Sequence, residues 1–380
     1  MGSRFDDQIA FSVSKPSGMR ISPRFLSLKP SPHFLSLPLL SHNPTKPFSL
    51  SSSAMESEST CILVLAGKSA ADKELANSMK VSNILKLPDV PVVSLLLHEE
   101  SPNESFRINS YMNSLSNTCF GRFLIWSPRL PSTHDVVSKN FEELPVGSVC
   151  VADVQYKGRG RSMNIWESPK GCLMFSFTIQ MQDGRIVPLV QYVVSLAMTE
   201  AINDVCTKDG VPYLDVRIKW PNDLYLDGLK VGGILCTSTY RSKKFNVSAG
   251  LGLNVDNERP TTSLNAILRK LTTVSYQLQR EDIVSAFFNK FEIFFNLFAT
   301  QGFKPLEELY YKTWLHSGQR VIVEEKNDEK DHGRQSMVTI QGLTSSGYLL
   351  AIGDDNQMCE LHPDGNSFDF FKGLIRRKLT

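Results

Sequence analysis

Apolar positions along the chain follow two periods, which predict a fold that mixes strands and helices. Short apolar runs bounded by polar or glycine-rich turns are typical of buried strands. Longer segments carry apolar side chains three or four positions apart, which is the spacing of a helix face. The predicted strands are 61–66, 90–98, 147–154, 172–179 and 245–256, and the predicted helices are 72–85, 188–206 and 281–299.

The C-terminal part of the chain has a different pattern. From residue 318 onward, short strands recur between turn signals, which predicts a small β barrel. A polar stretch rich in Asn and Ser, up to about residue 120, is expected to be a link without regular structure. The four C-terminal strands are expected at 319–325, 336–341, 347–352 and 357–361.

A basic glycine-containing segment lies between the strands predicted at 147–154 and 172–179. It reads Gly158-Arg159-Gly160-Arg161 and is followed by Trp166, Ser168-Pro169 and Gly171. Glycine lets backbone approach a ligand closely, and guanidinium groups donate forked hydrogen bonds to carboxylate or phosphate oxygens. The segment by itself fits either an anion-binding loop or an ordinary exposed turn.

Two further segments add lysines and glycines at strand ends. Lys219-Trp220-Pro221-Asn222-Asp223 leads through an Asp227-Gly228 turn to Lys230-Val231-Gly232-Gly233-Ile234-Leu235. An Asp-Gly pair between apolar runs is typical of a tight hairpin, and Pro221 predicts a kink at the strand end. The strand at 245–256 contains Gly250 and Gly252 and reaches Asn254.

In their order and spacing, these motifs resemble those of the biotin protein ligases, also called holocarboxylase synthetases. The resemblance runs from about residue 123 to the C-terminus and rests on GRGR-x4-W-x-SP-x-G, KWPNDL, K-x-GGIL and GLGLNV. It implies a two-step reaction, in which biotin and ATP form biotinyl-5′-adenylate and the activated carboxyl then acylates one lysine of a carrier domain. The implied partners are biotin, ATP and the biotin-carrier domains of carboxylases, and Mg²⁺ is expected to arrive with ATP rather than in a protein metal site.

The cations suit this chemistry on physical grounds. Biotin's carboxylate must approach the α-phosphate of ATP, so fixed positive charge is needed where negative charge accumulates. Arg159, Arg161, Lys219 and Lys230 are the candidates. The resemblance implies that Lys230, Arg161 and Arg159 are catalytic, with Lys230 reaching both anions. Lys219 either supports the nucleotide phosphates or pairs with Asp223.

The resemblance also implies the binding residues. Hydroxyl and amide groups suit biotin's ureido ring, which has one carbonyl acceptor and two N–H donors. This chain carries His134 where bacterial relatives commonly have Asn. The mobile loop of the family closes over ligand, which makes Gly158 and Gly160 candidate hinges. Implied for biotin are Ser132, Thr133, Gln155, Gly158, Arg159, Gly160, Arg161 and Lys230, and for the nucleotide Trp166, Lys219, Asn222 and Asn254.

The implied fold is α+β, with a mixed sheet like that of class II aminoacyl-tRNA synthetases and a C-terminal SH3-like β barrel. We therefore expect a catalytic domain at 121–316, a barrel at 317–380 and an N-terminal α/β extension at 55–120. The extension lacks paired short helices with a basic face, so a DNA-binding helix-turn-helix is not expected.

Composition limits the remaining possibilities. A formal net charge of +2 over 380 residues gives no overall attraction to nucleic acid, and no apolar run is long enough to predict a membrane span. Seven cysteines without a CxxC pair favour reduced thiols. The oligomeric state stays open.

The N-terminus has the composition of a targeting segment. Residues 1–54 contain thirteen serines, six basic residues and two acidic ones. This profile predicts a transit peptide, for the chloroplast rather than the mitochondrion, although a disordered tail would look similar. Met55 offers a second start that would leave a cytosolic form.

Two other functions remain open at this point. One is a lipoate or octanoate ligase or transferase on the same fold. The polar side chains of Ser132, Thr133 and Gln155 favour a ureido ligand over an alkyl chain. The other is a non-catalytic module in which the arginines bind an RNA backbone, which the near-neutral charge disfavours.

Overall fold

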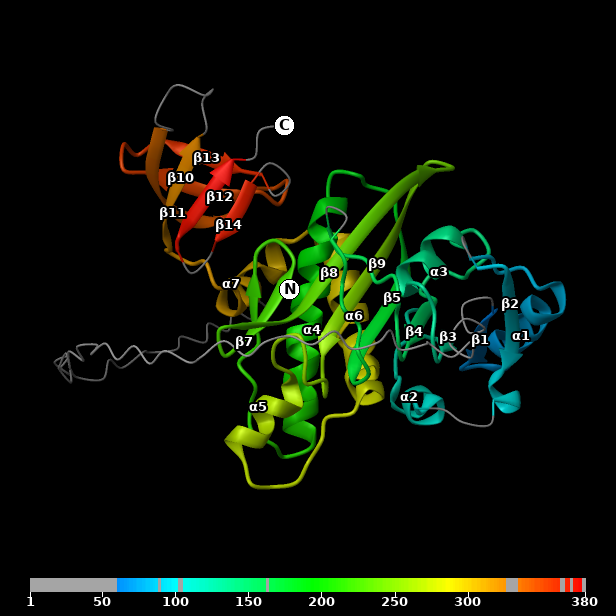
Figure 1. The fold of residues 1–380 in the computed structure, drawn as a ribbon. Helices are drawn as coiled ribbons and strands as arrows, with labels where there is room; N and C mark the ends of the chain where they lie inside the picture. The colour runs from blue at the N-terminus through cyan, green and yellow to red at the C-terminus, as the bar shows by residue number, and fades with distance from the viewer. Residues whose placement is uncertain are drawn as a thin grey trace, which may run out of the picture. The chain divides into compact units, whose positions relative to one another are not determined.

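A nine-stranded mixed sheet forms the main body of the described chain (Figure 1). The computed structural model describes residues 60–87, 90–101, 105–161, 164–325, 334–362, 366–369 and 372–377, so the predicted transit peptide and Met55 lie outside the described residues. The strand order is β2-β1-β3-β4-β5-β9-β8-β7-β6. The strands are β1 (Thr60–Gly67), β2 (Val92–Leu97), β3 (Phe123–Ser127), β4 (Val149–Ala152), β5 (Cys172–Met181), β6 (Arg217–Lys219), β7 (Asp223–Leu226), β8 (Leu229–Arg241) and β9 (Lys244–Asn254).

Two long helices cover one face of the sheet and were both predicted from their periodicity. Figure 1 shows α4 (Val190–Lys208) and α6 (Arg280–Gln301) lying side by side, and they contact each other along their length. The core between α6 and the sheet is aromatic. Phe175 and Phe177 of β5 meet Phe287 and Phe288 of α6 with ring centroids 5.2 to 5.8 Å apart. The phenylalanines of α6 are therefore core residues.

The strand at 61–66 and the helix at 72–85 were predicted correctly, as β1 and α1 (Ala70–Ser82). β1 pairs in parallel with β2 and antiparallel with β3, so the N-terminal α/β unit continues the same sheet. The prediction of a structureless link after it is wrong in part. Helix α2 (Ile108–Ser114) lies there, with Ile108 and Tyr111 fully buried.

Three other short helices had no clear signal in the sequence. They are α3 (Thr133–Lys139), α5 (Leu264–Leu271) and α7 (Glu307–Thr313), and single-turn 3-10 helices lie at His98–Glu100, Val187–Leu189 and Lys304–Leu306. None of the helices in the described ranges is long and apolar enough to cross a membrane. The seven cysteines, all of which lie in the described ranges, form no disulfide with one another.

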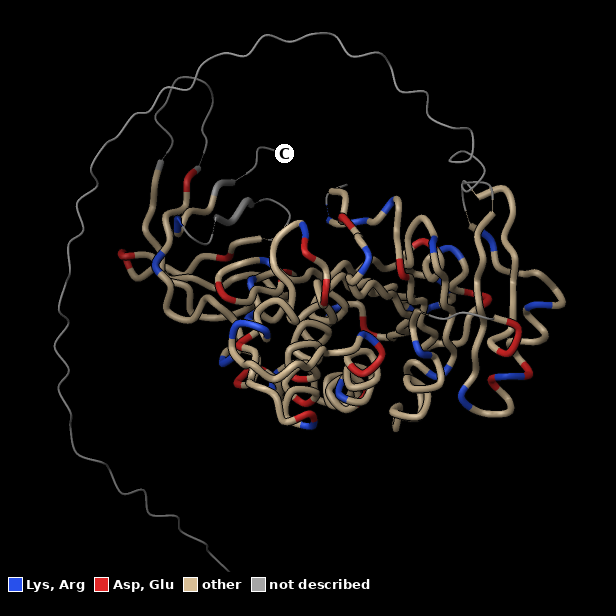
Figure 2. Tube along the Cα trace, turned by 60° about the horizontal axis from the view of Figure 1, so that its bottom comes forward, with Lys and Arg blue, Asp and Glu red and all other residues tan. Residues whose placement is uncertain are grey.

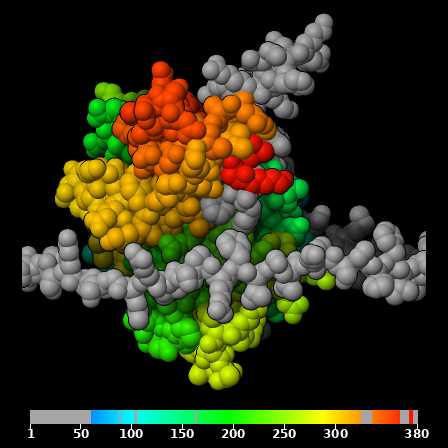
Figure 3. All heavy atoms as spheres, turned by 90° about the vertical axis from the view of Figure 1, so that its left-hand side faces the viewer, coloured from blue at the N-terminus to red at the C-terminus, as the bar shows by residue number. Residues whose placement is uncertain are grey.

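A second, six-stranded sheet follows α7, as the C-terminal turn pattern predicts. Its order is β13-β12-β11-β10-β15-β14. Figure 3 shows its orange residues packed against the gold residues of the α6 to α7 region. The α+β class with a separate small β domain is confirmed, although the last two strands were missed. The strands are β10 (Arg320–Glu325), β11 (Arg334–Leu343), β12 (Leu349–Gly353), β13 (Met358–Leu361), β14 (Asn366–Asp369) and β15 (Leu374–Arg377).

Candidate functional site

The predicted motifs converge on one cavity of about 670 Å³ above the middle of the nine-stranded sheet. Its floor comes from β5, β8 and β9, and its walls come from the start of α3, the arginine segment and the β6 to β7 connection. Ten of the twelve predicted site residues line it: Ser132, Thr133, Gln155, Arg159, Gly160, Arg161, Trp166, Lys219, Asn222 and Lys230. The other two, Gly158 and Asn254, lie nearby without lining it.

One end of the cavity is a connected set of neutral hydrogen-bonding groups. The Thr133 amide and hydroxyl both donate to Gln155 Oε1, over 2.7 and 3.0 Å. Thr133 Oγ1 also lies 2.8 Å from Ser176 Oγ on β5, and Gln155 Nε2 donates to Ser168 Oγ over 3.1 Å. Ser132 is buried at the same end as the N-cap of α3, yet its side chain makes no capping bond. These groups can be arranged to receive both the acceptors and the donors of a neutral polar ring.

His134 adds a neutral group to this end. Burial, helped by the nearby charge of Arg159, lowers the pKa of His134 to about 4. Its Nε2 lies 3.1 Å from Thr237 Oγ1 on β8. Gly250 lies directly beneath, since a Cβ there would come within 3.0 Å of Ser176 Oγ and 3.3 Å of the His134 ring. The glycine in the β9 motif therefore makes room for the polar end of the cavity.

The arginine segment pairs with residues 164–166, which follow it in the chain. The backbones of Arg159 and Ile165 form an isolated antiparallel β-bridge, and the Trp166 amide donates to the Gly158 carbonyl over 3.0 Å. Gly158 is buried, and a Cβ at this position would lie 2.5 Å from the Trp166 carbonyl oxygen. Close packing accounts for this glycine, and its predicted part in binding or hinge motion stays a prediction.

The other end of the cavity carries the cations, and each one binds a protein group. Arg159 pairs with Asp135 of α3 over 3.1 Å, and Lys230 pairs with Asp223 over 2.7 Å. Arg161 donates to Asn222 Oδ1 over 3.0 Å. The Arg159 and Lys230 side chains remain 56% and 38% exposed. A substrate anion can therefore reach them and replace the internal partners.

Trp166 forms a wall between the cations and the sheet. The Lys230 ammonium lies 5.5 Å from the centre of its ring system, a cation–π distance. A Cβ on Gly252 would collide with the indole at 2.4 Å, and one on Gly233 would touch it at 3.5 Å. Two motif glycines of β8 and β9 thus let the indole lie against the strands.

Of the predicted nucleotide residues, Lys219 lines the cavity and Asn254 does not. Lys219 lines the cavity with its ammonium 5.7 Å from the Tyr225 ring centre, whereas Asp223 pairs with Lys230. Lys219 and Asp223 are also register partners in the pairing of β6 with β7, so the suggested Lys219–Asp223 pair stays a prediction. Asn254 donates to the Thr262 carbonyl over 3.0 Å and accepts from the Cys172 thiol over 3.4 Å. That position is structural, and a contact of Asn254 with nucleotide stays a prediction.

Trp220 connects the cavity to the C-terminal sheet. Its indole Nε1 donates to Tyr192 Oη over 2.9 Å and to the Gly347 carbonyl over 3.3 Å. Its backbone amide donates to His316 Nε2 over 2.9 Å, and burial lowers the pKa of His316 to about 4. His316 is therefore a neutral acceptor, and the C-terminal part braces the β6 to β7 connection from behind.

Sequence reasoning missed several residues of the cavity. Ser176 was visible as a lone hydroxyl between Phe175 and Phe177 in an apolar strand, which is a useful signal. Pro260 had no local signal, because the tertiary structure alone brings it to the cavity. Asp135 does not line the cavity but pairs with Arg159, which does.

Comparison with known proteins gives the relationship. The chain is 68% identical over 338 residues to biotin–protein ligase 1, chloroplastic, of Arabidopsis thaliana, covering 87% of this chain and 92% of the relative. The chain belongs to the biotin protein ligase family. It is also 67% identical to biotin–protein ligase 2 of the same plant, over 86% of this chain and all of the relative. The human biotin–protein ligase is 30% identical, over 76% of this chain and 40% of the relative.

The family's domains fall on the described elements. The Biotin/lipoate A/B protein ligase family matches residues 126–254, a range that contains every predicted site residue. The biotin protein ligase C terminal domain matches residues 316–373. Among solved structures, the ligase of Aquifex aeolicus in complex with biotin and ATP aligns with a TM-score of 0.47 and 24% identity, covering 63% of this chain and 94% of that one. The β1–α1–β2 unit lies outside both matched ranges.

Proposed function

We propose that this biotin protein ligase activates biotin with ATP and transfers it to a lysine of a carboxylase carrier domain. A biotin carboxylate oxygen attacks the α-phosphorus, and the bond to pyrophosphate breaks. The uncharged ε-amine of the acceptor lysine then attacks the acyl carbon, an amide forms, AMP leaves and the amine loses a proton. The observation that carries this proposal is one cavity with a buried neutral polar end and an accessible cationic end.

Each end fits one part of the reactants. The hydroxyls of Ser132 and Thr133 and the Gln155 amide would bind the ureido ring, whose donors and acceptor must all be satisfied when buried. Lys230, Arg161 and Arg159 would bind the carboxylate and the α-phosphate, where fixed cations stabilise the charge of the transition state. No covalent enzyme intermediate is needed, because the carboxylate attacks directly.

The nucleotide would extend from the cationic end. We assign Trp166, Lys219 and Asn222 to its surroundings because they line the cavity there, and we retain Asn254 as a supporting residue behind them. Mg²⁺ would enter bound to the phosphates of ATP. We also retain the domain boundaries near residues 120 and 316.

The location and start sites are a further part of the proposal. The serine-rich N-terminus and the chloroplastic relative support a chloroplast form. A start at Met55 would give a cytosolic form, and comparing the location of tagged chains that begin at Met1 and at Met55 would test both.

The rival functions make different predictions about the cavity. A lipoate or octanoate enzyme needs an apolar channel for its alkyl chain, whereas Thr133, Gln155 and Ser176 place polar atoms there. RNA binding is favoured by a surface of one charge, and Figure 2 shows acidic and basic residues interspersed along the described chain.

The deciding experiment is exchange of labelled pyrophosphate into ATP by the full chain with Mg²⁺. We expect exchange that requires biotin and is not supported by lipoate or octanoate. Folded protein that shows no exchange with biotin would overturn the proposal, and exchange driven by lipoate would establish the first rival.

A further inference from the structure

The segment that carries the neutral polar end needs support from outside itself. Helix α3 has only seven residues, and its N-cap Ser132 makes no side-chain capping bond. An isolated helix of this length is not stable in water, so tertiary contacts must hold it in place. Because Thr133 is its first residue, any shift of α3 moves the hydroxyl that contacts Gln155 and Ser176.

Helix α3 packs on β4, β5 and β9, and its apolar side belongs to a buried cluster that extends from there to the β1–α1–β2 unit. Leu130, Val136 and Val137 are fully buried. Leu130 lies two residues before Ser132, and its backbone forms an isolated parallel β-bridge with Gln155. All three belong to a hydrophobic cluster that is separate from the main core and is built largely from that unit. Its members from the unit include Leu63, Leu65, Met79, Leu85 and Leu95.

A bidentate bridge fixes the far end of α3 to the same unit. The Lys86 amide donates to Asn140 Oδ1 over 2.8 Å, and Asn140 Nδ2 donates to the Lys86 carbonyl over 2.8 Å. Asn140 Nδ2 also donates to the Val136 carbonyl over 2.7 Å, one turn back in α3. The Asn140 side chain is buried, so losing these bonds would leave unsatisfied polar groups.

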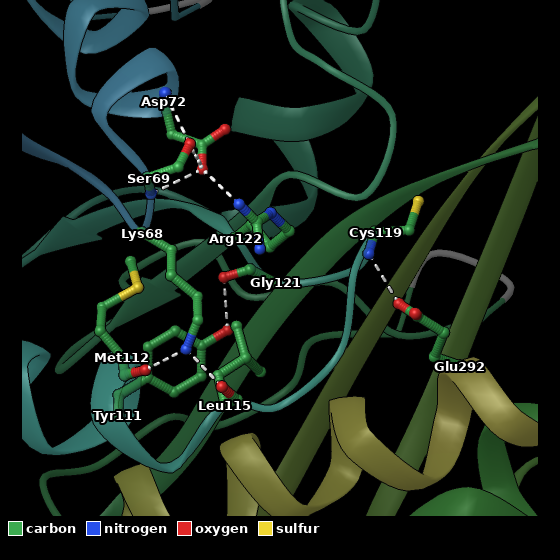
Figure 4. Close-up of polar contacts among 10 residues, drawn as sticks. All are labelled: Lys68, Ser69, Asp72, Tyr111, Met112, Leu115, Cys119, Gly121, Arg122 and Glu292. Atoms are coloured by element: carbon green, nitrogen blue, oxygen red, sulfur yellow. Dashed lines mark hydrogen bonds and ion pairs between the residues drawn. The ribbon is translucent and has the colours of Figure 1, made fainter.

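The unit is itself anchored, as Figure 4 shows. Lys68 donates to the Met112 carbonyl over 2.6 Å and to the Leu115 carbonyl, which fixes the loop after β1 to the end of α2. Arg122, beside β3, pairs with Asp72 of α1 over 3.2 Å. Because these contacts tie the unit to α2 and to the residue before β3, the unit is a fixed base for α3.

We propose that the β1–α1–β2 unit acts as a positioning element for biotin binding, holding α3 through the Asn140–Lys86 bridge and the cluster around Val136 and Val137. The proposal rests on the proposed function, since it assumes that Ser132 and Thr133 bind biotin. It assigns a role to the part of the chain that lies outside the family's two matched domains. Asn140 acts through α3 and does not touch the substrate.

The test is Asn140→Ala in the full chain, measured by pyrophosphate exchange with biotin and ATP varied separately. We expect the KM for biotin to rise about tenfold and the KM for ATP to rise much less, because the residues of α3 that line the cavity, Thr133 and His134, lie at the neutral end. The matched control is Asn289→Ala. Asn289 makes the same kind of bridge between α6 and the α2 region, accepting from the Ser116 amide over 2.8 Å and donating to the Ser114 carbonyl over 3.0 Å.

A second variant distinguishes the support by the N-terminal unit from the hydrogen bonds that Asn140 makes at the C-terminal end of α3. Leu85→Ala leaves Asn140 intact and removes apolar volume from the base, so it should raise the KM for biotin in the same direction. The proposal is overturned if both asparagine variants raise the two KM values alike, or if Asn140→Ala leaves the KM for biotin unchanged. Wild-type chain without biotin-dependent exchange would instead overturn the proposed function, so the two failures are distinguishable.

Discussion

The two ends of the cavity are built in opposite ways. At the neutral end, Thr133 is 3% exposed, and its partners are Gln155, which follows β4, and Ser176 of β5. At the cationic end, Arg159 and Lys230 are well exposed and hold carboxylates of the protein itself. A neutral ligand gains little from long-range attraction, so its site must be pre-organised, whereas exposed ion pairs contribute little stability and can be exchanged for substrate anions.

The two ends also have different supports. The neutral end is linked to the N-terminal unit through the Asn140–Lys86 bridge and a shared buried cluster. The cationic end is braced by the C-terminal sheet through Trp220, Tyr192 and Gly347. Changes at one end should therefore alter biotin affinity, and changes at the other should alter the rate of adenylation.

The largest effect is expected from Lys230→Ala. Removing this cation should lower biotin-dependent pyrophosphate exchange at least about a hundredfold, because it stabilises charge that develops in the transition state. Lys290→Ala is the matched control. Lys290 also forms an ion pair, with Asp204 over 2.8 Å, but neither residue lines the cavity. A similar loss in both variants, or none in Lys230→Ala, would contradict the assigned role.

A change in the C-terminal sheet should have the next largest effect. Gly347 has φ of 83°, and a Cβ there would lie 2.9 Å from the Tyr192 ring. Gly347→Ala should displace the Tyr192–Trp220 contact and lower the exchange rate about tenfold through misplacement of the β6 to β7 connection. Gly318→Ala is the control, because Gly318 has a similar φ of 68° but open space around its Cβ. Equal rates in the two variants would show that backbone strain alone is responsible.

Thr133→Val tests the neutral end without changing its shape. The substitution removes the hydroxyl that joins Gln155 and Ser176 but keeps the volume. Loss of about 1 kcal/mol of hydrogen bonding should raise the KM for biotin about fivefold and leave kcat nearly unchanged. Thr178→Val is the control. Thr178 lies on β5, the strand of Ser176, and its buried hydroxyl donates to the Pro145 carbonyl and accepts from the Gly147 amide. A fall in kcat with an unchanged KM for biotin would place Thr133 elsewhere in the reaction.

The smallest effect on activity at neutral pH is expected from His134→Asn. His134 is neutral there, since burial lowers its pKa to about 4, and an amide can replace its bond to Thr237, so exchange should change by no more than about twofold. Its effect should appear in acid instead. Between pH 6.5 and about 4 the unfolded chain binds a proton that the folded chain does not, so the free energy of unfolding falls as the pH falls.

Urea unfolding at several pH values measures this effect. The wild type should lose stability below pH 6.5, and His134→Asn should show a shallower slope. Burial also lowers the pKa of His316 to about 4, so His316 should keep contributing to the slope in that variant. An unchanged slope in His134→Asn would show that His134 is accessible to protons in the folded chain.

Local features of the fold were predictable because they depend on neighbouring residues. The Asp227-Gly228 turn is an example, since both residues have the positive φ that a tight hairpin requires. The periodicity of α4 and α6 was equally clear. The short helices α2 and α3 were missed because their positions depend on buried contacts with residues distant in sequence, such as the contact of Asn140 with Lys86.

The family motifs, the strands that carry them and the set of cations and hydroxyls available for chemistry can all be read from the amino-acid order. How those groups are paired depends on the folded chain, which joins Lys230 with Asp223, Arg159 with Asp135, and Asn254 with Thr262 behind the cavity. It also decided that β1 lies beside β3 and that the N-terminal unit supports α3. The physical reason is that strand and turn formation depends on local backbone preferences, whereas burial and pairing depend on contacts between segments far apart in the chain.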